Sequence, residues 1–174
     1  MKAYASQLVA ALIAIHKSDV CHRDLKLENL VLDADFKLKV IDFGIACDLS
    51  GDAGSGFCSR GMGSPGYLAP EILDFVDYQP IMADMFALGV IFFIMKTGFH
   101  PFKLAIQSDP QYKLLLSGRQ NLFWQMHEKN FGSAFSVEFK DLIENMLASK
   151  TYQRISMADV VMHPFFQQGK PMAT

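Results

Sequence analysis

The sequence has little net charge and no block of like charge. Its 16 lysines and arginines nearly balance 18 aspartates and glutamates, which leaves a formal net charge of -2 over 174 residues. Proteins that bind nucleic acid or anionic membranes electrostatically carry a basic surplus on one segment or face. We therefore expect neither nucleic acid nor a membrane as the main partner. The 51% hydrophobic content instead predicts one globular domain with an ordinary core.

Cysteine is also scarce, and its three positions form no pairing pattern. Cys21, Cys47 and Cys58 are odd in number, and their spacing matches neither a zinc site nor a disulfide framework. Because this usage is typical of a reducing compartment, we predict a cytoplasmic location. We interpret the three residues as thiols of the core or of loops.

No hydrophobic run is long enough to span a bilayer. Residues 85–95 are eleven uncharged residues between Asp84 and Lys96, whereas a crossing helix needs about 20. Because the segment is apolar on all sides, it predicts a helix buried at the centre of a helical domain.

The N-terminus resembles a signal peptide only in outline. An apolar run follows Lys2, but no small-residue cleavage site comes after it. Leu8, Leu12 and Ile15 instead recur at the spacing of one helix face. We predict an amphipathic helix that ends near Ser18.

The hydrophobic pattern changes period after this first helix. Residues 30–32 and 38–41 are two short β-type runs, which predict a small hairpin. Residues 49–66 are rich in glycine and serine, which indicates a regulatory or binding loop. Helical patterns follow at residues 84–95, 137–149 and 156–162, the last ended by Pro164, and Phe123 and Trp124 belong in or beside another short helix. The chain is therefore predicted to be mainly α with a small β-hairpin.

Functional side chains are densest at HRDLKLEN, residues 22–29, with DFG at residues 42–44 directly after the second predicted strand. Together these segments bring acidic groups, a lysine and a carboxamide around a hairpin. Such oxygens suit Mg²⁺, which takes one or two carboxylates and completes its octahedron with water and phosphate oxygens. A second carboxylate near a lysine can orient a hydroxyl nucleophile while the lysine neutralises charge on a transferring group. The combination indicates phosphoryl transfer.

These motifs resemble those of the C-terminal lobe of eukaryotic-type protein kinases. Residues 22–29 match the catalytic loop, residues 42–44 the metal-binding triplet, and APE at residues 69–71 the end of the activation segment, in family order. One such motif alone is more often a turn or a solvated charge pair, but coincidence poorly explains three in order. The resemblance implies a kinase-like C-terminal lobe over residues 1–174, with an activation segment at residues 42–71.

The resemblance gives each catalytic residue a role. Asp24 would accept a proton from the substrate hydroxyl or orient it, and Lys26 would contact the γ-phosphate. Asn29 and Asp42 would hold Mg²⁺ between the phosphates, and Val31 would form the floor under the adenine ring. ATP and Mg²⁺ are accordingly the expected cofactors.

The substrate class follows from further likenesses. Lys26 and the GSPGY segment at residues 63–67 resemble serine/threonine kinases, and the C-terminal half looks most like the calmodulin-dependent group. Ser64 stands where such kinases usually carry a threonine that contacts the catalytic residues. Glu28 resembles an acid that receives a substrate arginine, and a solvated loop charge is an equal alternative. We expect a protein substrate, with Ser64 and Glu28 contacting it.

Regulatory and scaffold residues are implied in the same way. Arg23 resembles an arginine that pairs with a phosphate on the activation segment, for which Ser59 is the best-placed acceptor and Ser55 the next. The alternative is that these serines simply suit a flexible loop. The family also implies a buried ion pair between Glu71 and Arg154, and contacts from Asp84 to the catalytic-loop backbone. These last three residues are expected to support the scaffold.

The sequence departs from the family in one large respect. A complete kinase domain has an N-terminal lobe with a glycine-rich loop and a strand lysine, and neither is matched here. We therefore expect a truncated catalytic lobe that is inactive alone, with a missing N-terminal lobe or a partner kinase as its partner. His22 and Phe43, the lower half of an apolar column in kinases, should then lie at an exposed surface. The alternative is a non-catalytic kinase-like binding or scaffold module.

Overall fold

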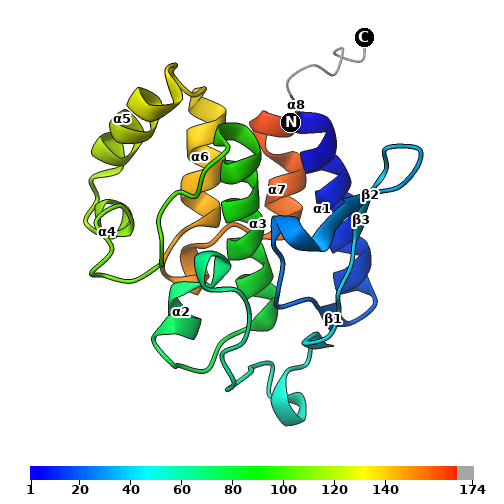
Figure 1. Cartoon of the computed structure of the whole chain (residues 1–174). Helices are drawn as coiled ribbons and strands as arrows, with labels where there is room; N and C mark the ends of the chain where they lie inside the picture. The colour runs from blue at the N-terminus through cyan, green and yellow to red at the C-terminus, as the bar shows by residue number, and fades with distance from the viewer. Residues whose placement is uncertain (168–174) are drawn as a thin grey trace.

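The computed structural model describes residues 1–167, and helices make up most of its regular secondary structure (Figure 1). The α-helices are α1 (Lys2–Lys17), α2 (Pro70–Leu73), α3 (Pro80–Thr97), α4 (Tyr112–Leu116), α5 (Gln120–Phe131), α6 (Val137–Met146), α7 (Met157–Met162) and α8 (Pro164–Gln167). The strands are β1 (Val20–Cys21), β2 (Leu30–Leu32), β3 (Leu38–Val40) and β4 (Cys47–Asp48). Two antiparallel pairs form, β1 with β4 and β2 with β3. The prediction of a mainly α fold with a small hairpin is confirmed.

Helix α3 is the centre of the molecule, between α1 and α6 (Figure 1). Pro80 occupies its first turn, and Gly98 ends it in the left-handed conformation. A side chain at Gly89 would place its Cβ only 2.8 Å from the Cβ of Met146, so α3 and α6 pack closely at this point. The run of residues 85–95 is too short to span a bilayer, but the whole of α3, at 18 residues, is long and apolar enough to cross a membrane. Inside the protein, however, 72% of this helix is buried. The predicted central helix is therefore confirmed, and it begins earlier, at Pro80.

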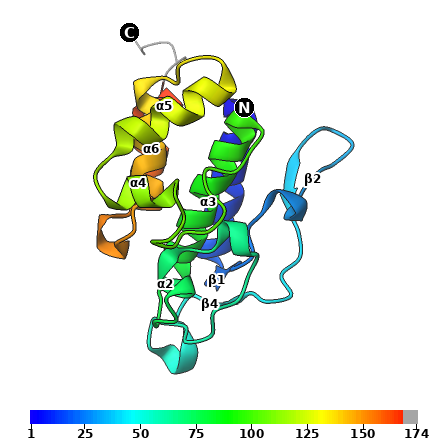
Figure 2. The same cartoon turned by 60° about the vertical axis from the view of Figure 1, so that its left-hand side comes forward.

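Helix α1 packs its predicted apolar face on the core. Leu8 and Leu12 are fully buried, and Ile15 is half-buried. The helix ends at Lys17, next to the predicted Ser18. The β2–β3 hairpin lies beside α1, and its turn extends away from the helices (Figures 1 and 2).

The C-terminal helices differ from their predicted bounds. Helix α6 ends at Met146, earlier than the expected residue 149. Pro164 ends α7 as predicted, because His163, which precedes it, is extended. The same proline then begins α8, since its fixed φ suits a first helical turn. A helix-ending proline therefore also starts the next helix.

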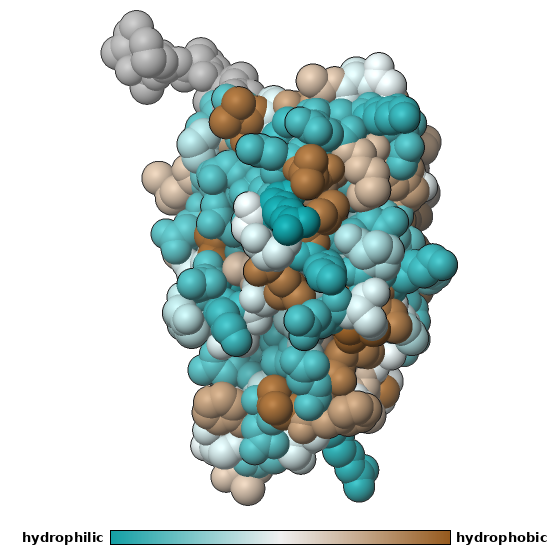
Figure 3. Space-filling view, turned by 90° about the vertical axis from the view of Figure 1, so that its left-hand side faces the viewer, coloured by the Kyte–Doolittle hydropathy of each residue, from teal (hydrophilic) through white to brown (hydrophobic). Residues whose placement is uncertain are grey.

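Helices α4 and α5 cover one side of α6 (Figure 2). On this face apolar side chains reach the surface between hydrophilic ones (Figure 3). Leu116 on α4 and Leu122 on α5 are exposed. Phe123 and Trp124 point inward from α5 and are buried. Their predicted short helix is therefore confirmed and is 12 residues long.

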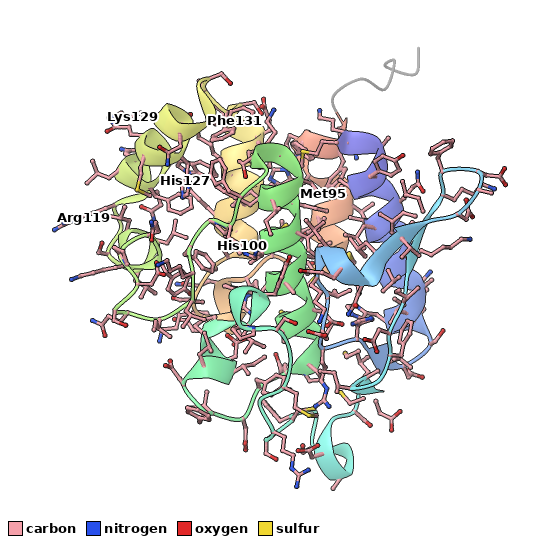
Figure 4. All side chains as sticks on the ribbon, in the orientation of Figure 1. Met95, His100, Arg119, His127, Lys129 and Phe131 are labelled. Carbon is pink, nitrogen blue, oxygen red and sulfur yellow. The ribbon has the colours of Figure 1, made fainter. Side chains whose placement is uncertain are left out.

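His127 lies on α5 among aromatic rings (Figure 4). Its ring centroid is 4.4 Å from that of Phe123, 4.8 Å from that of Phe93 and 5.7 Å from that of Phe99. Its Nε2 lies 3.0 Å from the Pro101 carbonyl oxygen, which can only accept, so Nε2 donates. Burial lowers the pKa of the His127 imidazole, and the hydrogen bond to Pro101 only partly opposes this effect.

We expect His127 to make the protein less stable as the pH falls below about 6.5. The unfolded imidazole takes up a proton there, whereas the folded one, with its lowered pKa, does not. One such proton changes the free energy of unfolding by at most about 1.4 kcal/mol per pH unit. Urea unfolding at about pH 7.5 and about pH 5.5 measures this loss. In His127→Gln, which keeps a donor for Pro101, the loss is expected to be smaller, and an equal loss in both proteins would contradict the prediction.

Candidate active site

A buried aspartate on α3 holds the backbone of residues 22–29. The Asp84 carboxylate accepts hydrogen bonds from the His22 amide at 2.9 Å and the Arg23 amide at 2.8 Å. It also lies 2.8 Å from Nε2 of His16 on α1. Arg23 has a φ of 64°, a strained value for a residue with a side chain, and these contacts keep it there. The scaffold role expected for Asp84 is confirmed.

Asp24, the next residue, is the centre of a compact polar network. Lys26 Nζ donates to Oδ2 of Asp24 at 2.7 Å, and Ser64 Oγ donates to Oδ1 at 2.8 Å. Lys26 also donates to Ser64 Oγ at 2.9 Å. Asn29 Nδ2 donates to the Asp24 carbonyl oxygen at 2.9 Å. Four residues that the sequence singled out for one site are therefore in direct contact.

The charges of this network stabilise each other. Burial by itself would raise the pKa of Asp24, but hydrogen bonds from Lys26 and Ser64 outweigh burial and lower it. The hydrogen bond to Asp24 in turn raises the pKa of Lys26. At neutral pH the site therefore holds an ionised carboxylate beside an ammonium group. This arrangement can orient a hydroxyl and neutralise an anion in the same place.

Gly63 brings Ser64 close enough to join the network. Its φ of 123° is a conformation that L side chains rarely adopt. A Cβ on this residue would lie 2.7 Å from the carbonyl oxygen of Arg23. The residue at position 63 must therefore be glycine for the segment before α2 to lie against the catalytic loop.

Hydrogen bonds tie Ile41, the residue before the DFG segment, to the catalytic loop. His22 Nε2 donates to the Ile41 carbonyl oxygen at 2.9 Å, while its Nδ1 accepts from the Asp24 amide at 3.3 Å. The Ile41 amide donates to the carbonyl oxygen of Asn29 at 2.9 Å. The hairpin therefore places Asp42, the residue after Ile41, next to the predicted metal ligand Asn29.

The donor set at this place fits a hard cation. Asp42 is exposed and has a φ of 63°, and its Oδ1 accepts from the Gly44 amide at 3.2 Å. Asn29 uses its Nδ2 toward Asp24, which leaves its carboxamide oxygen as a possible ligand. The negative charges of Asp24 and Asp42 both favour the charged form of Lys26 and raise its pKa. Carboxylate and carboxamide oxygens beside a lysine are suited to Mg²⁺ with bound phosphate.

The surface around these residues is open and partly apolar. Val31 is 39% exposed and Phe43 is 46% exposed. The Phe43 ring lies against His22, with centroids 4.8 Å apart. The expectation that the column of His22 and Phe43 ends at an exposed surface is confirmed for Phe43, whereas His22 itself is buried.

The predicted regulatory residues do not all meet. Arg23 donates to the Ile45 carbonyl oxygen at 2.7 Å and, at 3.4 Å, to the Tyr78 hydroxyl. Ser59 instead binds Asp52, to which both its amide and its hydroxyl donate at 2.8 Å. Neither Asp52 nor Tyr78 was singled out from the sequence, and these contacts were not predicted.

The remaining predicted contacts lie at the edges of the site. Ser55 donates its hydroxyl to the Phe57 carbonyl oxygen at 3.1 Å, within the loop. Glu28 is exposed, and the Tyr67 hydroxyl lies 3.5 Å from its Oε2. A role for Glu28 in substrate binding and a role for Ser55 in regulation both stay predictions.

An ion pair joins the end of the predicted activation segment to the C-terminal region. Arg154 contacts Glu71 through two hydrogen bonds, of 2.7 Å and 3.0 Å. It also donates to the carbonyl oxygens of Ala148 and Met82. Both charged residues are buried. The pair expected from the family resemblance is therefore present, with every oxygen of Glu71 in use.

Comparisons with known proteins agree with this geometry. A family model of the protein kinase domain matches residues 1–166. The chain is 35% identical over 168 residues to CBL-interacting protein kinase 30 of Oryza sativa subsp. japonica. This alignment covers 95% of the chain and 33% of that protein. It is also 35% identical over 171 residues to testis-specific serine/threonine-protein kinase 2 of Mus musculus. That alignment covers 96% of the chain and 45% of the relative. The chain thus spans between a third and a half of the length of these curated relatives.

Proposed function

Because the chain belongs to the protein kinase family, among relatives that are serine/threonine kinases, we propose that it carries the residues that transfer the γ-phosphoryl group of ATP to serine and threonine hydroxyls of proteins. The network of Asp24, Lys26 and Ser64, with contacts of 2.7 to 2.9 Å, is the observation that carries this proposal. It combines a hydroxyl-orienting carboxylate with a cation at a single point. The decisive experiment supplies an amino-terminal kinase lobe and measures phosphoryl transfer.

Each residue has a part in this proposal. Asp24 orients the substrate hydroxyl and takes its proton, and Lys26 neutralises charge on the transferring phosphoryl group. Asn29 and Asp42 supply oxygens to Mg²⁺, which screens the charge of the phosphates when bound. Val31 offers an exposed apolar surface on which the adenine ring can lie. The lowered pKa of Asp24 keeps this carboxylate ionised at neutral pH, ready to accept a hydrogen bond from a hydroxyl.

We further propose that residues 1–174 correspond to the C-terminal lobe of a kinase domain, with residues 42–71 as its activation segment. The exposure of Val31 and Phe43 supports this assignment, because a second lobe would cover them. The second wall of the nucleotide site then comes from an N-terminal lobe or from a partner kinase. The same exposed surface also suits the alternative, a non-catalytic module that binds another protein.

The 174-residue chain by itself is expected to bind MgATP weakly or not at all and to show negligible turnover. The reason is that Val31 would contact only one face of the adenine ring, and the main phosphate-binding lysine of a kinase lies in the other lobe. Titration calorimetry with MgATP measures the binding, with Asp42→Ala as the control. Micromolar binding that requires Mg²⁺ and disappears in Asp42→Ala would show that the lobe alone forms a working site.

A further inference from the structure

Two of the three cysteines, which no motif explains, lie next to each other within residues 42–71, the proposed activation segment. The sulfur atoms of Cys47 and Cys58 are 3.5 Å apart, and both are free thiols. We propose that this pair is a reversible disulfide site that reacts with a low-molecular-weight disulfide such as oxidised glutathione. The proposal does not rest on phosphoryl transfer, because it concerns the chemistry of the thiols alone.

The backbone holds both cysteines in place. Cys47 lies on β4, which pairs with β1. Cys58 exchanges two backbone hydrogen bonds with Tyr78, of 2.8 Å and 3.0 Å. The segment between the cysteines folds back on itself, since the Asp52 amide donates to the Phe57 carbonyl oxygen. The sulfurs must approach to about 2 Å to bond, a movement that side-chain rotation can supply without displacing these anchors.

The two thiols differ in their access to solvent. Cys58 is fully buried, whereas Cys47 is partly exposed. An oxidant from solution therefore meets Cys47 first, and Cys58 is placed to resolve the resulting intermediate. Burial raises the pKa of the Cys47 thiol, and the hydrogen bond with Cys58 raises it further, while the charge of Arg23 opposes both. Cys47 therefore rests as a thiol at neutral pH, and its exchange is expected to be faster at higher pH.

The reaction balances in two thiol–disulfide exchange steps. The Cys47 thiolate attacks one sulfur of oxidised glutathione, which forms a mixed disulfide and releases one glutathione thiolate. The Cys58 thiolate then attacks the Cys47 sulfur of the mixed disulfide and releases the second glutathione. Two cysteine thiols are oxidised and one glutathione disulfide is reduced to two thiols, which take up the two cysteine protons.

The third cysteine provides an internal competitor. Cys21 on β1 lies opposite Cys47 in the strand register, so a disulfide between these two is the main alternative. The two outcomes are distinguishable by trypsin, because residues 40–60 form one peptide with both Cys47 and Cys58. Cys21 falls in a different peptide, residues 18–23.

The test equilibrates the folded chain with reduced and oxidised glutathione, blocks the remaining thiols with N-ethylmaleimide and analyses tryptic peptides by mass spectrometry. The peptide of residues 40–60 is expected to be unblocked and lighter by two hydrogens, while the Cys21 peptide is blocked. The equilibrium constant for this disulfide is expected to be roughly tenfold or more larger in the folded chain than in the urea-unfolded chain, because a fold that presents both thiols favours the bond.

Matched variants complete the test. Cys47→Ser and Cys58→Ala are expected to abolish the internal disulfide, and Cys21→Ala is expected to leave it unchanged. The chain with only Cys47 is expected to stop at the mixed disulfide with glutathione. A link between Cys21 and the peptide of residues 40–60, or equal equilibrium constants in the folded and unfolded chains, would overturn the proposal.

Discussion

We expect the chain to phosphorylate serine or threonine in a protein substrate when it is fused behind the amino-terminal lobe of testis-specific serine/threonine-protein kinase 2. In this fusion, Asp24→Asn is expected to slow phosphoryl transfer about 10²- to 10⁴-fold. Asparagine cannot take a proton from the substrate hydroxyl. It also loses the charge that pairs with Lys26 at 2.7 Å. The measurement is the initial rate of phosphate incorporation from labelled MgATP.

The control for this experiment is Asp35→Asn. Asp35 is an exposed aspartate in the turn between β2 and β3, away from the network of Asp24. Its loss is expected to leave the rate unchanged. A fusion that binds MgATP but transfers no phosphate would favour the non-catalytic module, and equal rates with and without Asp24 would contradict the assigned role.

Breaking the buried ion pair is expected to cause the largest loss of stability. Arg154→Met removes both hydrogen bonds to Glu71 and leaves that carboxylate buried without its partner. The expected decrease in the free energy of unfolding is about 3–5 kcal/mol, the usual consequence of leaving a buried charge unpaired. Urea unfolding of the two proteins at neutral pH measures the difference.

Two further variants show whether the loss belongs to the pair. Arg119→Met changes an exposed arginine before α5 (Figure 4) and is expected to cost little. The double variant Glu71→Gln with Arg154→Met is expected to lose less than the sum of the two single variants, because neither partner then leaves a charge behind. A loss in Arg154→Met no larger than that in Arg119→Met would show that the pair contributes nothing.

The sequence predicted the elements that repeat a pattern over several residues. The apolar run of α3 and the spaced leucines of α1 are signals of this kind, and both helices lie where expected. The residues of the polar network were found because they stand in motifs whose order resembles a family. Contacts between them, such as that of Ser64 with Asp24, were predicted from that resemblance and not from the spacing of the residues.

The features that the sequence did not reveal depend on contacts between distant or very short segments. Strands β1 and β4 contain two residues each, too few for an alternating pattern. The contact of Ser59 with Asp52 and that of Cys47 with Cys58 arise from the path of one glycine-rich loop. Helix α8 was missed because a proline that ends one helix can begin another.

The long chain separation of the contacts that hold the site has a consequence for biosynthesis. Asp84 follows His22 by 62 residues, and Arg154 follows Glu71 by 83 residues. At a synthesis rate of about 5–20 residues per second, Asp84 is added to the chain roughly 3–12 seconds after the catalytic loop that it anchors. During this interval α1 has emerged without α3, so its apolar face is open to chaperones or to aggregation. Contacts between residues far apart in the chain form slowly, so the nascent chain is most prone to aggregation before these contacts have formed.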